Sequence, residues 1–134
     1  MDFLLNLHGH NRWLIAGVWL VGTAILLAGQ RYAQSTRLRQ LAMLAAGTLF
    51  GLMTLQLLLG GILFFWKWQS TGTIPRYRWE HVLTMLLVLL GLHFPLRWRH
   101  IPLPSWWRRM LWLYLVAGLF LYLGVSRLPK GWLG

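Results

Sequence analysis

Residues 79–96, WEHVLTMLLVLLGLHFPL, contain the pattern that decides the fold. A charged pair, Glu80 and His81, stands at the start of an apolar run that continues to Leu96. An ionisable group at the edge of a membrane segment is costly and usually has a function. The stretch therefore predicts a membrane helix that begins near residue 79 and carries a functional histidine at its entrance.

Four apolar blocks of this kind divide the chain. Its 134 residues are 57% hydrophobic and 11% charged, proportions that are rare in a soluble domain. Crossing a bilayer core takes about 20 helical residues, a length that the blocks reach with their aromatic flanks. No basic stretch precedes the first block, so we expect a retained helix there and not a cleaved signal. The sequence predicts one all-α transmembrane domain over residues 1–134, an antiparallel four-helix bundle with helices at about 8–29, 38–67, 79–97 and 105–126.

Cysteine and charge content restrict the partners of the chain. The absence of cysteine excludes disulfides, thiolate metal sites, iron–sulfur clusters and covalently attached haem. The net charge of +11 comes from basic residues between the apolar blocks, so the lipid bilayer and not nucleic acid is the predicted partner. Seven basic residues fall in the first and third connections and six elsewhere. This narrow difference favours both termini outside.

Two histidines on different helices are predicted to meet. In an antiparallel bundle the first and third helices begin at one membrane face, which puts His8 or His10 at the depth of His81. His8 and His10 point to different sides of their helix, so we expect only one of them to face the interior. Two histidines at one depth can bind a haem iron from opposite sides. A histidine at a helix end is often only an interfacial polar residue, which is the interpretation favoured for His10 and His100, whereas the shared depth of His8 and His81 favours a functional role for them.

The neighbourhood of this histidine pair contains side chains suited to a haem. Arg12 and Arg78 are candidate partners of the haem propionates, although Arg12 could equally extend to the lipid headgroups. Glu80 either orients an imidazole through its second nitrogen or forms a salt bridge with a nearby arginine. Gly60 allows the close approach of a flat macrocycle or of another helix.

A second polar group is expected deeper in the bundle. His93 lies 12 residues after His81, about 18 Å farther along a helix, so the two cannot share one iron. Counting from the predicted helix ends places Gln56 and Tyr114 near His93. This trio would bind a quinone headgroup, ligate a second haem, relay protons or satisfy its own hydrogen bonds.

Three short motifs in the first three predicted helices form a recognisable set. They read LHGHNRW at residues 7–13, QLLLG at residues 56–60, and RWEH at residues 78–81 followed by Met85, Gly91 and His93. Together they resemble a small bacterial four-helix membrane family labelled cytochrome b or cytochrome b-like, in which Ser stands at the place of Gly9. The resemblance implies a protein of the bacterial inner membrane that binds one or two haem b groups.

The sequence leaves two functions open. One is electron transfer between a membrane donor such as quinol and a partner, alone or as a subunit of a larger redox complex. A haem edge near the basic rim would add oxidation of quinol or reaction with superoxide. The other is a cofactor-free accessory subunit of a respiratory or photosynthetic complex. A transporter is disfavoured, because the predicted helices lack acidic residues in their interiors.

Overall fold

The computed structural model describes residues 2–132, and no strand occurs within that range. Four of its segments are long and apolar enough to cross a membrane. The prediction of an all-α chain with four long apolar helical segments is therefore confirmed. The elements in chain order are α1 (Asp2–Arg31), α2 (Thr36–Thr71), α3 (Arg76–Gly91), the short α4 (Phe94–Arg97), the 3-10 turn η1 (Trp98–His100) and α5 (Leu103–Ser126).

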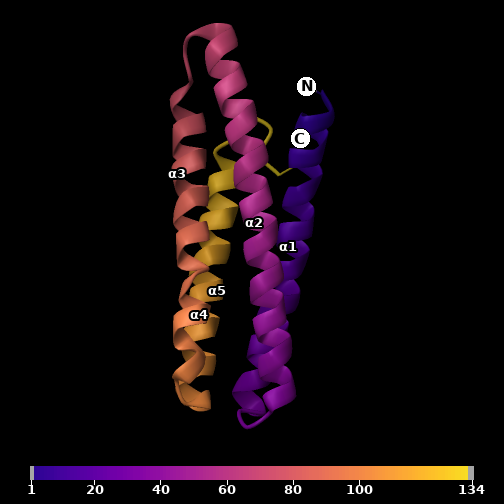
Figure 1. The fold of residues 1–134 in the computed structure, drawn as a ribbon, viewed down its shortest axis with the longest axis vertical. Helices are drawn as coiled ribbons and strands as arrows, with labels where there is room; N and C mark the ends of the chain where they lie inside the picture. The colour runs from indigo at the N-terminus through magenta and orange to yellow at the C-terminus, as the bar shows by residue number, and fades with distance from the viewer. Residues whose placement is uncertain (1, 133–134) are drawn as a thin grey trace.

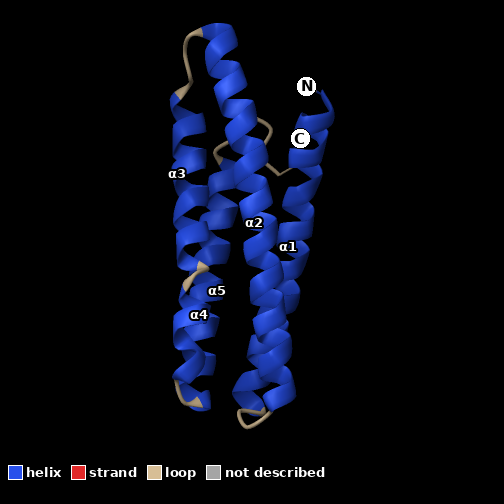
Figure 2. Cartoon of the chain, in the orientation of Figure 1, coloured by secondary structure: helices blue, strands red, loops and turns tan. Residues whose placement is uncertain are grey.

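The long helices lie side by side along the longest dimension of the molecule (Figure 1). The chain descends through α1 in this view, rises through α2, descends through α3 and α4, and rises again through α5. Figure 2 shows how short the connecting loops are. Helix α1 packs against α2 and α5, and α3 packs against α5 and α2. Both chain ends therefore lie toward the end that carries the α2–α3 connection.

Helices α1 and α2 are longer than the sequence predicted. Helix α1 begins at Asp2 rather than near residue 8. Helix α2 starts after Ser35, whose hydroxyl oxygen accepts the Leu38 N–H as an N-cap, and it continues to Thr71. It ends at Gly72, which has a φ of 68°. Glycine adopts this left-handed conformation without the penalty that a side chain would bring.

The third long segment is interrupted, whereas the sequence predicted one helix over 79–97. Helix α3 begins at Arg76 and ends at Gly91, and α4 follows after a turn at Leu92 and His93. Pro95 explains the break, because it has no amide hydrogen to donate and its ring would clash with the carbonyl four residues earlier, at Gly91. His81 therefore lies within α3, whereas His93 lies in the turn between α3 and α4.

Tryptophan packing fills the core near the α1–α2 connection. Trp106 and Trp107 of α5 are 0% and 1% exposed. The indole N–H of Trp107 donates to the Ala33 carbonyl at 2.9 Å, which ties α5 to the end of α1. A Cβ atom at Gly29 would overlap the Trp107 ring, so this contact requires glycine in α1. In the lower part of the bundle in Figure 1, α5 thus packs its Trp107 ring directly against the α1 backbone at Gly29.

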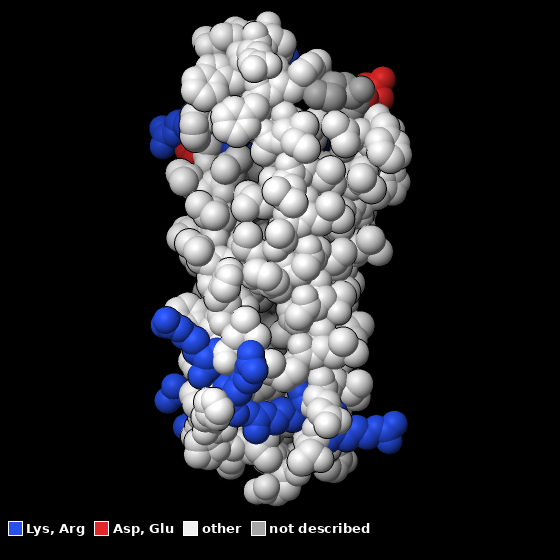
Figure 3. All heavy atoms as spheres, viewed as in Figure 1, with Lys and Arg blue, Asp and Glu red and all other residues white. Residues whose placement is uncertain are grey.

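Charged side chains gather toward two ends and leave an uncharged band between them on the face drawn in Figure 3. We call the end formed by the α1–α2 and α4–α5 connections the arginine end. The opposite end, which carries His8, His81 and the chain termini, is the histidine end. The only two acidic residues of the chain, Asp2 and Glu80, belong to the histidine end. The basic residues of the arginine-end connections are Arg31, Arg37, Arg39, Arg97, Arg99, Arg108 and Arg109.

Candidate functional site

The structure brings His8 of α1 and His81 of α3 together at the histidine end. Their ring centroids are 6.5 Å apart and the ring planes are inclined by 76°. Both side chains are partly buried between the helices. The two residues are 73 positions apart in the chain (81 − 8), so only the tertiary arrangement of α1 and α3 makes them neighbours.

The orientation of the His81 ring is fixed from α5. Its Nδ1 lies 2.8 Å from the Gly124 carbonyl oxygen, a geometry in which Nδ1 donates and Nε2 remains available. A backbone carbonyl on the second ring nitrogen is a common way to orient a metal-binding histidine. Helix α5 comes close enough because Gly124 has no side chain; a Cβ atom there would overlap the methyl group of Met85. The sequence contains no signal for this contact, because its acceptor is a backbone atom.

The His8 ring lies against bare backbone of α2. A Cβ atom at Gly60 would be 3.1 Å from Cε1 of His8, so glycine at this position makes room for the ring. The side-chain nitrogen Nε2 of Gln56 donates to the His8 carbonyl at 3.1 Å and lies 3.3 Å from Nε2 of the ring. The other ring nitrogen, Nδ1, is buried without a hydrogen-bond partner within the described residues.

A buried amide pair extends the site from His8 into the bundle. Asn11 and Gln56 are 3% and 7% exposed. The Asn11 amide donates to Oε1 of Gln56 at 2.8 Å and to the Leu52 carbonyl at 3.1 Å. Sequence reasoning missed Asn11, although its position three residues after His8 puts both side chains on one helix face. These bonds join α1 to α2 at the level of the histidine pair.

The expected second group of His93, Gln56 and Tyr114 does not assemble. Gln56 belongs to the His8 site, because the end of α2 reaches beyond the start of α3 (Figure 1) and equal counts from the two helix ends do not give equal depths. His93 is exposed at the helix break, where Nδ1 lies 3.2 Å from the Leu89 carbonyl and the ring packs edge-on against Phe50.

Tyr114, the third member of that expected group, is buried against α1. It is 0% exposed, and a Cβ atom at Gly22 would meet its ring. Its hydroxyl has no hydrogen-bond partner within residues 2–132, while its carbonyl accepts the indole N–H of Trp19 at 2.7 Å. Tyr114 therefore contributes to α1–α5 packing.

His10 points away from the histidine pair. Its side chain is exposed, and Nδ1 lies 2.7 Å from the Asn6 carbonyl of the same helix. Of the two N-terminal histidines, the structure therefore places His8 and not His10 beside His81.

Arg12 of α1 and Arg78 of α3 belong to the same end of the bundle as the histidine pair. Nη1 of Arg12 donates to the Gly131 carbonyl at 3.1 Å, and its guanidinium lies 5.7 Å from the Trp13 ring centroid. The Arg78 guanidinium lies 6.0 Å from the Tyr77 ring centroid.

Glu80 forms salt bridges and does not orient His81. Its carboxylate accepts from Arg76 at 2.8 Å and lies 3.8 Å from Arg127 at the end of α5. The Nδ1 position of His81 is already taken by the Gly124 carbonyl. Of the two roles expected for Glu80, the structure shows the salt bridge.

Comparison with known proteins adds no family to this description. Neither a protein-family model, nor a curated protein, nor a solved structure matches the chain. A functional proposal therefore rests on the chain's own residues and their geometry.

Proposed function

We propose that the four long segments span a lipid bilayer, with both termini on the outer face. The uncharged band in Figure 3 supports this placement, as do large apolar side chains that face outward on every long segment. Leu20, Leu58, Leu83 and Leu119 are each more than half exposed, and a soluble monomer rarely exposes apolar surface on this scale. The arginine end has the greater number of basic residues and is assigned to the cytoplasmic side.

We further propose that His8 and His81 would together hold one haem b, and the distance between their rings is the observation that carries this proposal. Imidazole nitrogens bind a metal at about 2 Å, which puts two such rings on opposite sides of one ion with centroids about 6 Å apart. The observed 6.5 Å is close to that separation. The unpartnered Nδ1 of His8 and the carbonyl-oriented ring of His81 fit the same role.

The small number of protein ligands favours haem over a bare metal ion. Within residues 2–132 no three His, Cys, Asp or Glu side chains come together at a metal-binding distance. Zinc sites in proteins use three or four protein ligands, so a histidine pair would leave such an ion under-coordinated. Haem brings four in-plane nitrogens and needs only axial ligands from the protein.

Each neighbouring residue has a role in this proposal. Gly124 holds the His81 ring through its carbonyl, and Gln56 with Asn11 holds the His8 backbone against α2. Arg12 and Arg78 supply positive charge for the propionates at the headgroup level. Bound haem supplies reversible one-electron redox chemistry. We therefore infer a membrane b-type cytochrome that transfers electrons between a quinol-type donor and a partner subunit.

The reduced spectrum of the purified protein tests this function. The proposal predicts a Soret band with sharp alpha and beta bands after dithionite, and reduction of the same bands by a short-chain quinol. The variant His93→Ala serves as a control, because His93 is exposed and lies 12 residues after His81. The spectrum of this variant should equal that of the wild type. A colourless protein that co-purifies with a large respiratory assembly would instead establish the accessory-subunit alternative.

A further inference from the structure

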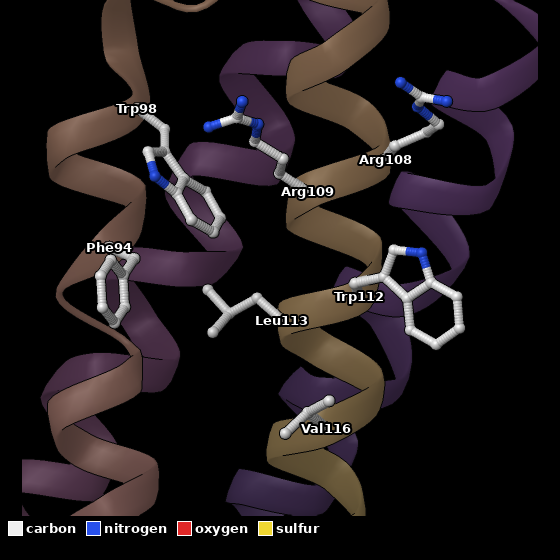
Figure 4. Close-up of a pocket in the computed structure, with 7 residues that line it drawn as sticks. All are labelled: Phe94, Trp98, Arg108, Arg109, Trp112, Leu113 and Val116. Carbon is white, nitrogen blue, oxygen red and sulfur yellow. The ribbon is translucent and has the colours of Figure 1, made fainter.

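A groove of about 540 Å³ runs along the outer surface of the bundle at the arginine end (Figure 4). Phe94 of α4 and Trp98 of η1 form one wall, and α5 forms the other with Arg109, Leu113 and Val116. The indole of Trp98 and the side chain of Leu113 point into the space between the two walls. The groove shares no residue with the histidine site.

The α5 wall changes from cationic to apolar along the groove. Arg109, Leu113 and Val116 follow one another at intervals of four and three residues, which places them on one helix face. At 1.5 Å per residue the stripe covers about 10 Å, from the connection at the arginine end toward the middle of the bundle. The groove thus matches a ligand with a negative head and a hydrocarbon chain.

The arginines of the groove have no acidic side chain of this protein to pair with. The only two acidic residues are Asp2 and Glu80, and Glu80 pairs with arginines at the histidine end. Arg108 and Arg109 are both exposed at the outer end of the groove, and Figure 4 shows Arg109 pointing toward Trp98 and Arg108 pointing to the opposite side of α5. A guanidinium group is well suited to a phosphodiester, whose oxygens accept paired hydrogen bonds.

A second, more polar cavity adjoins the same arginine. It has a volume of about 320 Å³ and lies between the end of α1 and the start of α5. Arg108 lines both cavities, and Gln30 and Ser105 add an amide and a hydroxyl to the smaller one. The amide and the hydroxyl can form hydrogen bonds with hydroxyl groups of a lipid headgroup attached to the phosphate. The surface around Arg108 thus offers positive charge for a phosphate, polar groups for headgroup hydroxyls and an apolar groove for an acyl chain.

We propose that this surface binds one anionic phospholipid with a hydroxylated headgroup. The phosphodiester pairs with Arg109 at the outer end of the groove, and one acyl chain occupies the groove beside Trp98. Arg108 attracts the headgroup toward the second cavity, where its hydroxyls reach Gln30 and Ser105. The inference rests on the membrane placement proposed above and is independent of haem. It assigns the arginine end a specific lipid site in addition to its general attraction for acidic membranes.

Titration of the detergent-purified protein with dioleoyl phosphatidylglycerol, followed by native mass spectrometry, tests the proposal. The wild type should bind one molecule in preference to dioleoyl phosphatidylcholine. The double variant Arg108→Gln/Arg109→Gln should bind phosphatidylglycerol about thirtyfold more weakly. The matched control Arg31→Gln/Arg37→Gln removes equal charge from exposed positions at the same end and should keep wild-type affinity. Equal losses in the two double variants would reduce the effect to overall charge and overturn the site.

Three further measurements test the acyl-chain contact, the phosphodiester contact and membrane insertion one by one. Val116→Trp fills the groove without changing charge and should weaken binding about fivefold or more; unchanged affinity would contradict the acyl-chain position. Soluble glycerophosphoglycerol should not displace the lipid at equal concentration, and displacement would show a site for free phosphodiester. Flotation of the wild type with liposomes tests membrane insertion separately. Flotation without lipid selectivity overturns only the lipid site.

Discussion

The two ends of this bundle are built by different means. At the arginine end, Trp106 and Trp107 fill the core and pack against bare backbone at Gly29. At the histidine end, Gln56 joins α2 to α1 by hydrogen bonds, and the ring of His81 joins α3 to the backbone of α5. Apolar ring packing stabilises a fold without directing chemistry, whereas buried polar groups are costly unless they are fully paired. The two largest buried rings thus lie at one end, and the candidate ligand site lies at the other.

The largest expected effect is on the tryptophan packing. Trp107→Ala removes a side chain that is 1% exposed and should lower the free energy of unfolding by about 3–5 kcal/mol. Trp112→Ala, on the same helix but 68% exposed, should change it by about 0.5 kcal/mol or less. Denaturant unfolding in detergent, followed by far-UV circular dichroism, measures both. Similar losses for the two variants would show that the arginine end is not held by buried rings.

Replacing the glycine that faces Trp107 should have the next largest effect. Gly29→Ala places a methyl group against a ring that cannot move freely, with a cost of about 1–3 kcal/mol. Gly17→Ala is the matched control in α1, because a Cβ atom there meets nothing within 4 Å. That control should stabilise the helix by about 0.5–1 kcal/mol. Equal signs for the two changes would contradict the close approach of α1 and α5.

A double-mutant cycle tests the polar network at the histidine end. Asn11→Ala and Gln56→Ala remove two partners of one hydrogen bond, so their effects should be coupled by about 0.5–3 kcal/mol. Gln56→Ala and Trp107→Ala act at opposite ends and should be additive within about 0.5 kcal/mol. Unfolding free energies of the single and double variants give both coupling energies. Strong coupling between the ends would mean that they do not act as separate regions.

Neutralising Glu80 should have the smallest effect. Its salt bridge with Arg76 is largely exposed, and such pairs contribute about 1 kcal/mol or less. Glu80→Gln should therefore leave the haem spectrum unchanged and shift the unfolding midpoint only slightly. A large spectral change would instead show that Glu80 is part of the histidine site.

Much of this fold follows from hydrophobic patterning. Four apolar blocks in 134 residues predict four long helical segments, and the structure has them. Pro95 could have predicted the helix break after Gly91, but the continuous apolar run over residues 82–96 favoured one unbroken helix. The extra length of α2 depends on the caps at Ser35 and Gly72, which are single residues within polar connections.

The candidate site was predictable in part. Counting depths along antiparallel helices pairs either His8 or His10 with His81, and the structure places the His8 ring beside that of His81. The Gly124 carbonyl was not predictable, because any residue supplies a carbonyl and only the packing of α5 selects this one. The position of Gln56 was wrong because counting from predicted helix ends assumes that those ends are level, whereas α2 reaches beyond the start of α3 (Figure 1).

The haem-to-protein ratio of the purified protein shows whether His8 and His81 together hold one haem. A pyridine haemochrome assay on purified protein should give about one haem per chain for the wild type and for His10→Ala, whose ring lies outside the pair. His8→Ala and His81→Ala should each lose the haem while remaining helical by circular dichroism. Full haem content in either of these two variants, or none in the wild type, would contradict the account.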